Sequence, residues 1–417
     1  MTRASHALRS PLLIANCEGT GQLKIGIAGP IDITFMRDLF PPHTDFPETV
    51  SSAHIASLTF ALYNRGHEIV IFALSGQVKS TRRIDGDRIS AYICPLRRPR
   101  YQMLDLFRAE RHSLRDAMQV SGCDVIHAHW TYDFGWAAVE SGLPHVVSAH
   151  DVPMVVLRFA RHPYWLLKPL LAWPVLRKAR CVTAVSPYCA DAIRSLVPPE
   201  REIIVVPNSI QEYPSELIKT KQAHSAESPF SFAAVFNGWS SLKNGKRLVE
   251  AFRILRTEFG EQVQLLMFGF GLERDGPAHR WSRRWRLADG VQFLGWQQHR
   301  VLLSRLATDV DALVHPSLEE TFCNAAAEAM AREIPVVGGL HSGAIPWLLD
   351  YGRAGLLVDV TSPTAIAQGM RSLLKDADLR RTLGRLGRER VLNEWPLEKI
   401  AQKYESVLED AMKEQMR

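Results

Sequence analysis

The sequence predicts an α/β protein built from two doubly wound parallel sheets, and three observations support that prediction. Segments rich in branched apolar residues alternate with helical patterns, which is typical of parallel sheets covered by helices on both faces. A length of 417 residues predicts two to three domains. Because 46% of the residues are hydrophobic and 23% are charged, the composition is that of a soluble globular protein, not a disordered or fibrous one.

The first half of the chain contains enough strands for one complete doubly wound domain. Its strands are short apolar runs such as LKIGIA and EIVIFAL, and an amphipathic helix is expected at residues 51–65. The expected strands lie at residues 23–28, 68–74, 125–128, 145–148, 181–185 and 203–206.

A polar segment with a proline near each end, QEYPSELIKTKQAHSAESP, then interrupts the apolar pattern. Beyond it we expect strands at residues 230–236, 264–268, 291–294, 312–315 and 334–337, and helices at 248–259, 324–332 and 399–416. The predicted division is a flexible extension over residues 1–22, a first domain over 23–212, a linker over 213–229, a second domain over 230–395 and a C-terminal helix within 396–417 that packs back on the first domain. Open α/β sheets bind ligands at the carboxyl ends of their strands, so two such domains are expected to share a cleft.

The net charge and the hydropathy of the sequence indicate which binding partners and which cellular location to expect. The net charge of +6 favours polyanions, among them nucleotide phosphates and anionic membranes. The longest strongly apolar run, residues 164–176, contains Lys168 and is shorter than the roughly 20 residues that span a bilayer. No cleavage pattern follows the apolar run at residues 12–15, so we expect no secretory signal and a cytoplasmic location. The six cysteines lie far apart, which argues against a zinc site or a disulfide framework.

The segment HPSLEETFCNAAAEAMAREIPVV at residues 315–337 carries the strongest chemical signal. A loop containing Glu320 leads into an alanine-rich helix that contains Glu328. The backbone N–H groups at the start of such a helix lack partners and favour a phosphate. Two carboxylates beside a phosphate can accept hydrogen bonds from the hydroxyl groups of a sugar nucleotide.

This segment resembles the signature of the retaining glycosyltransferases of family four, which carry an E-x7-E motif and have the GT-B fold. Glu320, Phe322, the run EAMA that begins at Glu328 and the run PVV at residues 335–337 stand in register with that signature. Other landmarks follow in order and extend the resemblance over nearly the whole chain after residue 22: GHEI at 66–69, DVIH at 124–127, HVVSAHD at 145–151, VPN at 206–208, and Lys243 before LVEAF at 248–252.

The resemblance implies roles for individual residues. It implies that the first domain binds an acceptor and that the second binds the donor, a nucleoside diphosphate sugar. His150, Lys243 and Glu320 are the expected catalytic residues, with His150 at the reacting face of the sugar and Lys243 at the diphosphate. The donor-binding residues are expected to be Lys243, Glu320, Thr321, Phe322, Cys323 and Glu328, with Glu328 at the ribose. Fixed cations and helix amides would stabilise the departing diphosphate.

The chain departs from the family pattern at one phosphate contact. The position five residues before Lys243, where the family usually has an arginine, is Gly238. Arg247 or the cluster Arg280, Arg283, Arg284 and Arg286 is a candidate replacement, although a solvated basic helix face explains that cluster as well. No D-x-D pair follows an expected strand, and His127 and His129 lack a third ligand, so we expect no metal and no cofactor.

Two basic segments of the first domain are candidates for contact with an acceptor or with the inner face of a membrane. From Arg158 to Arg180, aromatic and basic residues alternate without an acidic residue, as they do at membrane interfaces, and snorkelling over the domain surface is the alternative; the segment that begins at Arg97 adds a second basic patch. The candidate residues are Arg97, Arg98, Arg100, Arg158, Arg161, Trp165 and Lys168.

The predicted function is therefore transfer of a sugar, with retention, to a carbohydrate or lipid-linked acceptor during surface polysaccharide or glycolipid assembly. A sugar-nucleotide binding protein with impaired catalysis, suggested by Gly238, and an epimerase or phosphorylase on the same fold remain as alternatives. Nucleic acid is not an expected partner, because no recognition motif accompanies the charge.

Overall fold

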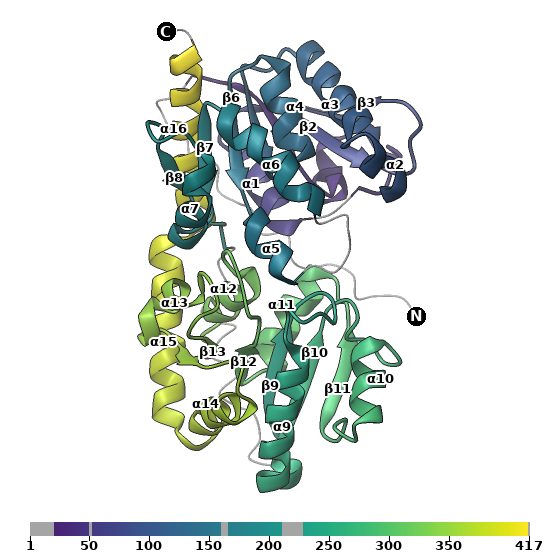
Figure 1. Ribbon diagram of the computed structural model, residues 1–417. Coiled ribbons are helices and arrows are strands. Elements are labelled where there is room, and N and C mark those ends of the chain that lie inside the picture. The colour runs from purple at the N-terminus through teal and green to yellow at the C-terminus, as the bar shows by residue number, and fades with distance from the viewer. Residues whose placement is uncertain (1–20, 50–51, 160–165, 211–227, 416–417) are drawn as a thin grey trace, which may run out of the picture.

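The computed structural model describes residues 21–49, 52–159, 166–210 and 228–415, and it consists of two α/β domains stacked one on the other (Figure 1). Most of the predicted extension at residues 1–22 and most of the predicted linker at 213–229 lie outside the described residues. The prediction of two parallel-sheet domains is confirmed.

The N-terminal domain is built on an eight-stranded sheet in the order β3-β4-β2-β1-β5-β6-β7-β8. All neighbours pair in parallel except β3, which is antiparallel to β4 at one edge. The strands are β1 Lys24–Ala28, β2 Glu68–Ser75, β3 Arg82–Asp85, β4 Ile89–Pro95, β5 Val125–His129, β6 His145–Ala149, β7 Cys181–Ala184 and β8 Ile203–Val205.

The central strands of this sheet are buried along their length because helices cover both faces. Every residue of β5 and β6 is buried, and so is all of β2 after Glu68. Gly26 in β1 has a packing reason, since a Cβ there would lie 2.9 Å from the ring of Phe72 and closer still to the side chain of Ile126. The covering helices are α1 Ala53–Asn64, α2 Pro99–Leu104, α3 Arg108–Val120, α4 Asp133–Ser141, α5 Pro153–Phe159, α6 Leu167–Lys178 and α7 Pro187–Ile193.

The C-terminal domain contains a six-stranded, fully parallel sheet in the order β11-β10-β9-β12-β13-β14. Its strands are β9 Phe230–Val235, β10 Val263–Phe268, β11 Val291–Gly295, β12 Ala312–His315, β13 Val336–Gly339 and β14 Leu356–Val358. Its helices are α9 Gly245–Phe259, α10 Pro277–Arg284, α11 His299–Asp309, α12 Asn324–Met330, α13 Ile345–Leu348, α14 Pro363–Lys375 and α15 Ala377–Glu394. The strand predicted at 334–337 begins only at Val336, because Pro335 has no N–H to donate to the sheet.

The last helix, α16 Leu397–Gln415, returns to the N-terminal domain and packs there beside α1 (Figure 1). Ile400, Tyr404 and Leu408, spaced at helical intervals, are buried in the core of that domain. On the same helix, Glu405 accepts hydrogen bonds from Arg65 and lies 2.7 Å from His67 Nε2. Apolar burial and a buried charged contact therefore hold α16 in place.

The chain leaves the N-terminal domain after Ile210 and re-enters it at α16, and these two points lie side by side. The backbone N–H of Ile210 donates to the carbonyl oxygen of Trp395 at 2.9 Å, and Ile210 forms a parallel bridge with Pro396. The end of the first stretch of the N-terminal domain, at Ile210, is thus hydrogen-bonded to the backbone at the end of the C-terminal domain, at Trp395. None of the described helices is long and apolar enough to cross a bilayer.

Candidate active site

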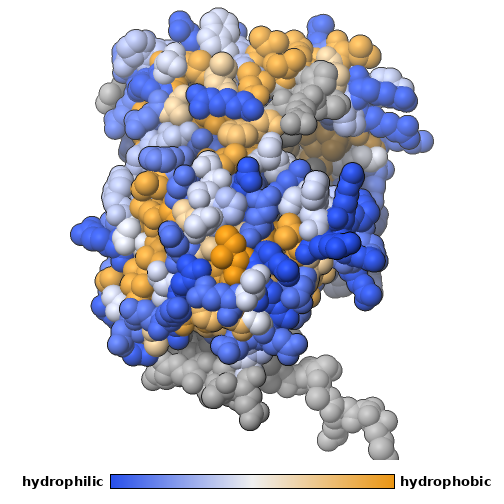
Figure 2. Space-filling view, turned by 60° about the horizontal axis from the view of Figure 1, so that its bottom comes forward, coloured by the Kyte–Doolittle hydropathy of each residue, from blue (hydrophilic) through white to orange (hydrophobic). Residues whose placement is uncertain are grey.

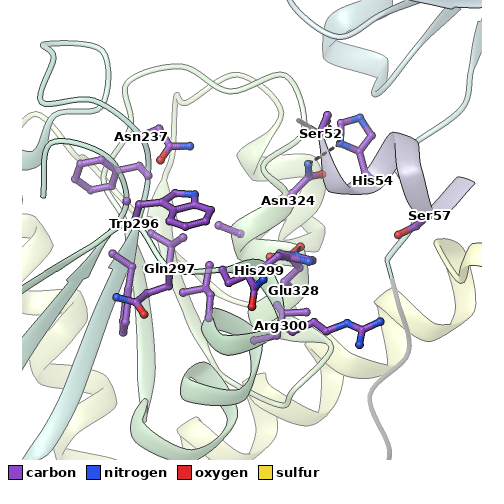
Figure 3. Close-up of a pocket in the computed structure, with 18 of the residues that line it drawn as sticks. Ser52, His54, Ser57, Asn237, Trp296, Gln297, His299, Arg300, Asn324 and Glu328 are labelled. Atoms are coloured by element: carbon purple, nitrogen blue, oxygen red, sulfur yellow. Dashed lines mark hydrogen bonds and ion pairs between the residues drawn. The ribbon is translucent and has the colours of Figure 1, made fainter. Parts of the chain in front are cut away.

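A cleft of about 940 Å³ separates the two domains and is lined by residues of both. Figure 3 shows Ser52, His54 and Ser57 on the α1 side, facing Asn324 and Glu328 across the cleft. Trp296, Gln297, His299 and Arg300, around the start of α11, form another wall of the cleft. The carboxyl ends of β9, β10 and β12 border this space, which is the usual ligand-binding edge of an open parallel sheet.

A second cavity of about 340 Å³ adjoins the cleft and reaches His150 and helix α5. The residues that line both cavities are His54, Lys243, Glu320, Cys323 and Asn324. The two cavities therefore meet at the loop that precedes α12.

That loop holds Glu320 in a fixed position. It begins where β12 ends at His315, and the carbonyl oxygen of Glu320 accepts a hydrogen bond from Ala344 N–H at 2.8 Å. Gly343 lies against the same carbonyl with φ +60, and a Cβ at that position would clash with it. Only glycine fits there without strain.

The amide end of α12 faces both cavities without a side-chain cap. Cys323 precedes the helix in the left-handed region with φ 82, and no side chain there accepts a capping hydrogen bond. Asn324 and Ala325, the first helical residues, line the cleft. The first-turn N–H groups are thus in the position that suits an anionic ligand.

Glu320 is the centre of a buried charge cluster. Its Oε1 lies 2.6 Å from Lys243 Nζ and 2.9 Å from His315 Nε2. Burial alone would raise the pKa of Glu320, but the charge of Lys243 and the hydrogen bond from His315 outweigh it and hold the pKa well below its usual range. Burial would lower the pKa of His315, yet Cys323 and Glu320 raise it to about 10. Burial also opposes the charge of Lys243, but Glu320 raises its pKa overall.

At neutral pH the cluster brings the cations of Lys243 and His315 together with the carboxylate of Glu320, and the Cys323 side chain lies beside them. Two cations beside a helix amide end are suited to a diphosphate.

Glu328 lies one turn into α12 and its carboxylate is held by a histidine that the sequence analysis did not single out. His299 Nε2 and Glu328 Oε1 are 2.8 Å apart. Arg332, four residues farther along, donates to the backbone carbonyl oxygen of Glu328 at 2.8 Å. One carboxylate oxygen is thus oriented by His299 and the other is available at the cleft wall.

His150 reaches the site from the N-terminal domain, at the end of β6. Its Nε2 lies 2.9 Å from His129 Nδ1, and its backbone carbonyl oxygen accepts a hydrogen bond from the hydroxyl of Thr321 at 2.7 Å. Burial holds the pKa of His150 well below its usual value, and the nearby His54 and His127 add to the effect. His150 is therefore neutral at physiological pH and lies in contact with the Glu320 loop.

Further contacts join the two domains around this point. Asn208 donates to the side-chain oxygen of Asn324 at 2.9 Å, and Asn324 Nδ2 lies 3.4 Å from His54 Nδ1, as the dashed line in Figure 3 marks. Phe322 is buried against the rings of Trp347 and Trp395, so its side chain anchors the loop in the core while one edge borders the smaller cavity.

The cations proposed to replace the arginine at Gly238 lie away from the cleft. Arg247 pairs with Glu250, and neither it nor the arginines of α10 and Arg286 line the cavity. Arg300, at the start of α11, does line it and is exposed. Within the described part of the chain, Arg300 has no ion-pair partner. A sequence reading could find it only by knowing that α11 begins at His299, beside the cleft.

The candidate acceptor or membrane residues fall into three groups. Arg98, Arg100 and Arg158 are exposed, whereas Arg97 pairs with Asp105 and the fully buried Glu110. Lys168 lies 3.6 Å from the ring of Tyr132, and burial lowers its pKa despite the charges of Asp151 and Asp133. Arg161 and Trp165 lie outside the described residues.

No group of three or more His, Cys, Asp or Glu residues that could hold a metal ion occurs in the described ranges.

Two family models match the chain, one for each domain. Residues 221–390 match the model described as glycosyl transferases group 1, and residues 51–212 match the model of glycosyltransferase family 4. The chain is 26% identical over 327 residues to N-acetyl-alpha-D-glucosaminyl L-malate synthase of Bacillus anthracis. This match covers 75% of this chain and 81% of that protein. It is 29% identical to the capsular polysaccharide biosynthesis glycosyltransferase CapM of Staphylococcus aureus over 40% of this chain and 43% of CapM.

Solved structures share the fold over almost the whole chain. Sucrose-phosphate synthase from Thermosynechococcus elongatus has a TM-score of 0.74 and 19% identity, and the match covers 93% of this chain and 99% of that one. Anabaena HepE in complex with UDP and glucose has a TM-score of 0.68 and 16% identity, with 93% and 100% covered.

Proposed function

Because the chain belongs to the group 1 glycosyltransferases of family 4, we propose that it transfers a sugar from a nucleoside diphosphate sugar to a carbohydrate or lipid-linked acceptor, with retention of the anomeric configuration. The product would enter a surface polysaccharide or a glycolipid, by analogy with CapM, which acts in capsular polysaccharide biosynthesis. A cytoplasmic site of action and a reaction without a metal ion are parts of the same proposal.

One observation carries this proposal. The uncapped amide end of α12 and the charge cluster that contains the cations of Lys243 and His315 meet where the two interdomain cavities join. A nucleoside diphosphate sugar matches this arrangement, because its diphosphate suits the anion site and its sugar and ribose hydroxyls suit the polar groups on either side.

The residues divide the donor between them. Lys243 and the first amides of α12 would bind the diphosphate, and Glu328, oriented by His299, would accept hydrogen bonds from the ribose hydroxyls. Glu320 would bind hydroxyls of the donor sugar, and His150 would face its reacting side. Arg300 would add a further cation to the cleft, in a different place from the position occupied by Gly238.

In the proposed reaction the bond between the anomeric carbon and the diphosphate oxygen breaks, and a bond from the acceptor oxygen to that carbon forms on the same face. The acceptor hydroxyl proton passes to the departing phosphate oxygen, so atoms and charge balance. The cations of the cluster and the helix amides stabilise the negative charge on the leaving group, and one preorganised donor of this kind is typically worth roughly 100- to 1,000-fold in rate.

A thermal-shift screen against nucleoside diphosphate sugars tests donor binding directly, because a ligand that binds only the folded state raises the melting temperature. We expect one base and one sugar to stand out, and we expect Glu328→Gln to weaken that shift. Glu261→Gln is the matched control, because Glu261 is exposed and lies outside both cavities.

An acceptor screen with the selected donor then tests transfer, and NMR of the product determines its anomeric configuration. An inverted product would contradict the assignment of retention. A donor shift without transfer to any acceptor would favour a binding protein, and turnover without an acceptor would favour an epimerase.

A further inference from the structure

Helix α6 exposes an apolar stripe on the surface of the N-terminal domain. Leu166, just before the helix, Leu170 and Trp173 are each more than half exposed, at 61%, 61% and 56%. At 3.6 residues per turn, these positions and Arg177 fall within roughly 60° of one another around the helix axis. The stripe is therefore a continuous surface feature and not a set of unrelated exposed side chains.

The opposite side of α6 packs on the core of the N-terminal domain. Leu171, Ala172, Val175 and Leu176 are buried against the rest of the domain. Lys168 points to that side as well, which explains why its ammonium group lies over the ring of Tyr132 instead of beside the stripe. The exposed leucines and the tryptophan thus serve no packing purpose within the described part of the chain.

The same region carries positive charge and no negative charge. Between Asp151 and Asp191 the sequence contains six basic residues and no acidic one. Of these, Arg158, Arg177, Lys178 and Arg180 are exposed, and the Arg177 guanidinium lies 5.8 Å from the ring centroid of Trp173. A further exposed hydrophobic residue, Met154, stands on the neighbouring helix α5.

From this arrangement we propose that the α5–α6 face docks on an anionic lipid bilayer. Leucine and tryptophan side chains on a helix flanked by arginine and lysine suit the boundary between acyl chains and headgroups. Each basic residue near an anionic surface adds to the attraction, and salt weakens that attraction. Figure 2 shows hydrophobic side chains gathered on the upper part of the molecule, which is the N-terminal domain.

Docking in this way would bring the smaller cavity to the membrane. Helix α5 lies between the two domains in Figure 1, and Val152, just before it, and Val155 and Phe159, on it, line the cavity that reaches His150. An acceptor with a lipid tail would then enter from the bilayer. This consequence rests on the proposed function, whereas docking itself does not.

Co-sedimentation with vesicles tests the docking face without any turnover. The vesicles are phosphatidylcholine alone or an equal mixture with phosphatidylglycerol. We expect the wild-type protein to sediment with the mixed vesicles, to stay in solution with phosphatidylcholine alone, and to be released from the mixed vesicles by high salt.

The paired variant Leu166→Glu/Leu170→Glu is expected to weaken binding to the mixed vesicles at least about tenfold, because it adds charge to the apolar stripe. The control Ile254→Glu/Tyr351→Glu changes the net charge equally at exposed positions of the other domain and should bind like the wild type. Trp173→Gln, which adds no charge, should also weaken binding.

All variants are compared for melting temperature, since exposed substitutions should leave it unchanged. Wild-type protein that remains in solution with mixed vesicles overturns the proposal. So does a Leu166→Glu/Leu170→Glu protein that sediments as well as its control, or a face that instead mediates self-association of the chain without lipid. Loss of docking with intact donor turnover leaves the proposed function standing.

Discussion

Replacing Lys243 by methionine tests the charge cluster, because it removes the ammonium group and keeps most of the side-chain volume. Lys243 Nζ lies 2.6 Å from the carboxylate of Glu320, whose other cationic partner is His315 at 2.9 Å. Removing one partner of a buried pair typically costs 3–5 kcal/mol. His315 remains, and the side chains of Lys243 and Glu320 are 23% and 14% exposed, so we expect about 1–3 kcal/mol of stability to be lost.

The effect on turnover should be larger than the effect on stability. Loss of one fixed cation at the departing diphosphate is expected to lower kcat/KM for the donor by roughly 100- to 1,000-fold, or about 2.7–4 kcal/mol of transition-state stabilisation. The assay is steady-state release of the nucleoside diphosphate, with urea unfolding of the same preparations.

Lys246→Met is the matched control for this experiment. Lys246 lies on α9, three residues after Lys243, is exposed, and has its ammonium group 5.6 Å from the ring centroid of Trp281. It should keep wild-type turnover. Wild-type turnover in Lys243→Met would refute the reasoning, and so would an equal loss in both variants.

Three further outcomes follow from contacts described above. Glu405→Ala should lower the free energy of unfolding in urea by about 3 kcal/mol, because Arg65, just after α1, and the buried His67, just before β2, lose the carboxylate that they contact; an unchanged midpoint would contradict this. Burial lowers the pKa of His127 to about 3. Below pH 6.5 the unfolded chain therefore binds a proton that the folded protein does not, so the folded state is fully stable above pH 6.5 and loses stability as the pH falls toward 3. His127→Gln should reduce the slope of unfolding free energy against pH by up to about 1.4 kcal/mol per unit between about pH 4 and 6, and parallel slopes would refute the assignment. Arg300→Gln should weaken nucleoside diphosphate binding in calorimetry about tenfold without changing the melting temperature, and unchanged affinity would remove Arg300 from the site.

Most of the buried strands were predictable from the sequence. β1, β2, β5 and β6 are buried and rich in branched apolar residues, and their residues matched the expected ranges within one or two positions. β3 was missed because it is a four-residue edge strand whose residues are three-quarters exposed and charged. β4 was also missed, although its residues Ile89 to Cys94 are buried and mostly apolar, like those of the strands that were found. The helices α2 to α4 and the short strand β14 were not singled out either.

Residues of the candidate site could be placed together from the sequence when they are close along the chain. Residues that are distant along the chain and meet only in the folded protein could not. Glu320 and Glu328 share one loop and helix, so their spacing alone placed them near one another. His299 and Arg300 reach the cleft from a different strand-helix unit, and nothing in their own neighbourhood marks them. Lys168 was grouped with a basic surface because its sequence neighbours are basic and aromatic, whereas its position on α6 directs it toward Asp151 and Asp133.

The backbone bridge between Ile210 and Pro396 restricts how the molecule can move. Two chain crossings that lie side by side favour rotation of the domains about that place over sliding of one domain along the other. Substrate entry would then need a hinge rotation that breaks the contacts of Asn208 with Asn324 and of His150 with Thr321. Removing α16 would leave one crossing and would also take Ile400, Tyr404 and Leu408 out of the core of the N-terminal domain, so both the direction of the motion and the stability of that domain depend on the same helix.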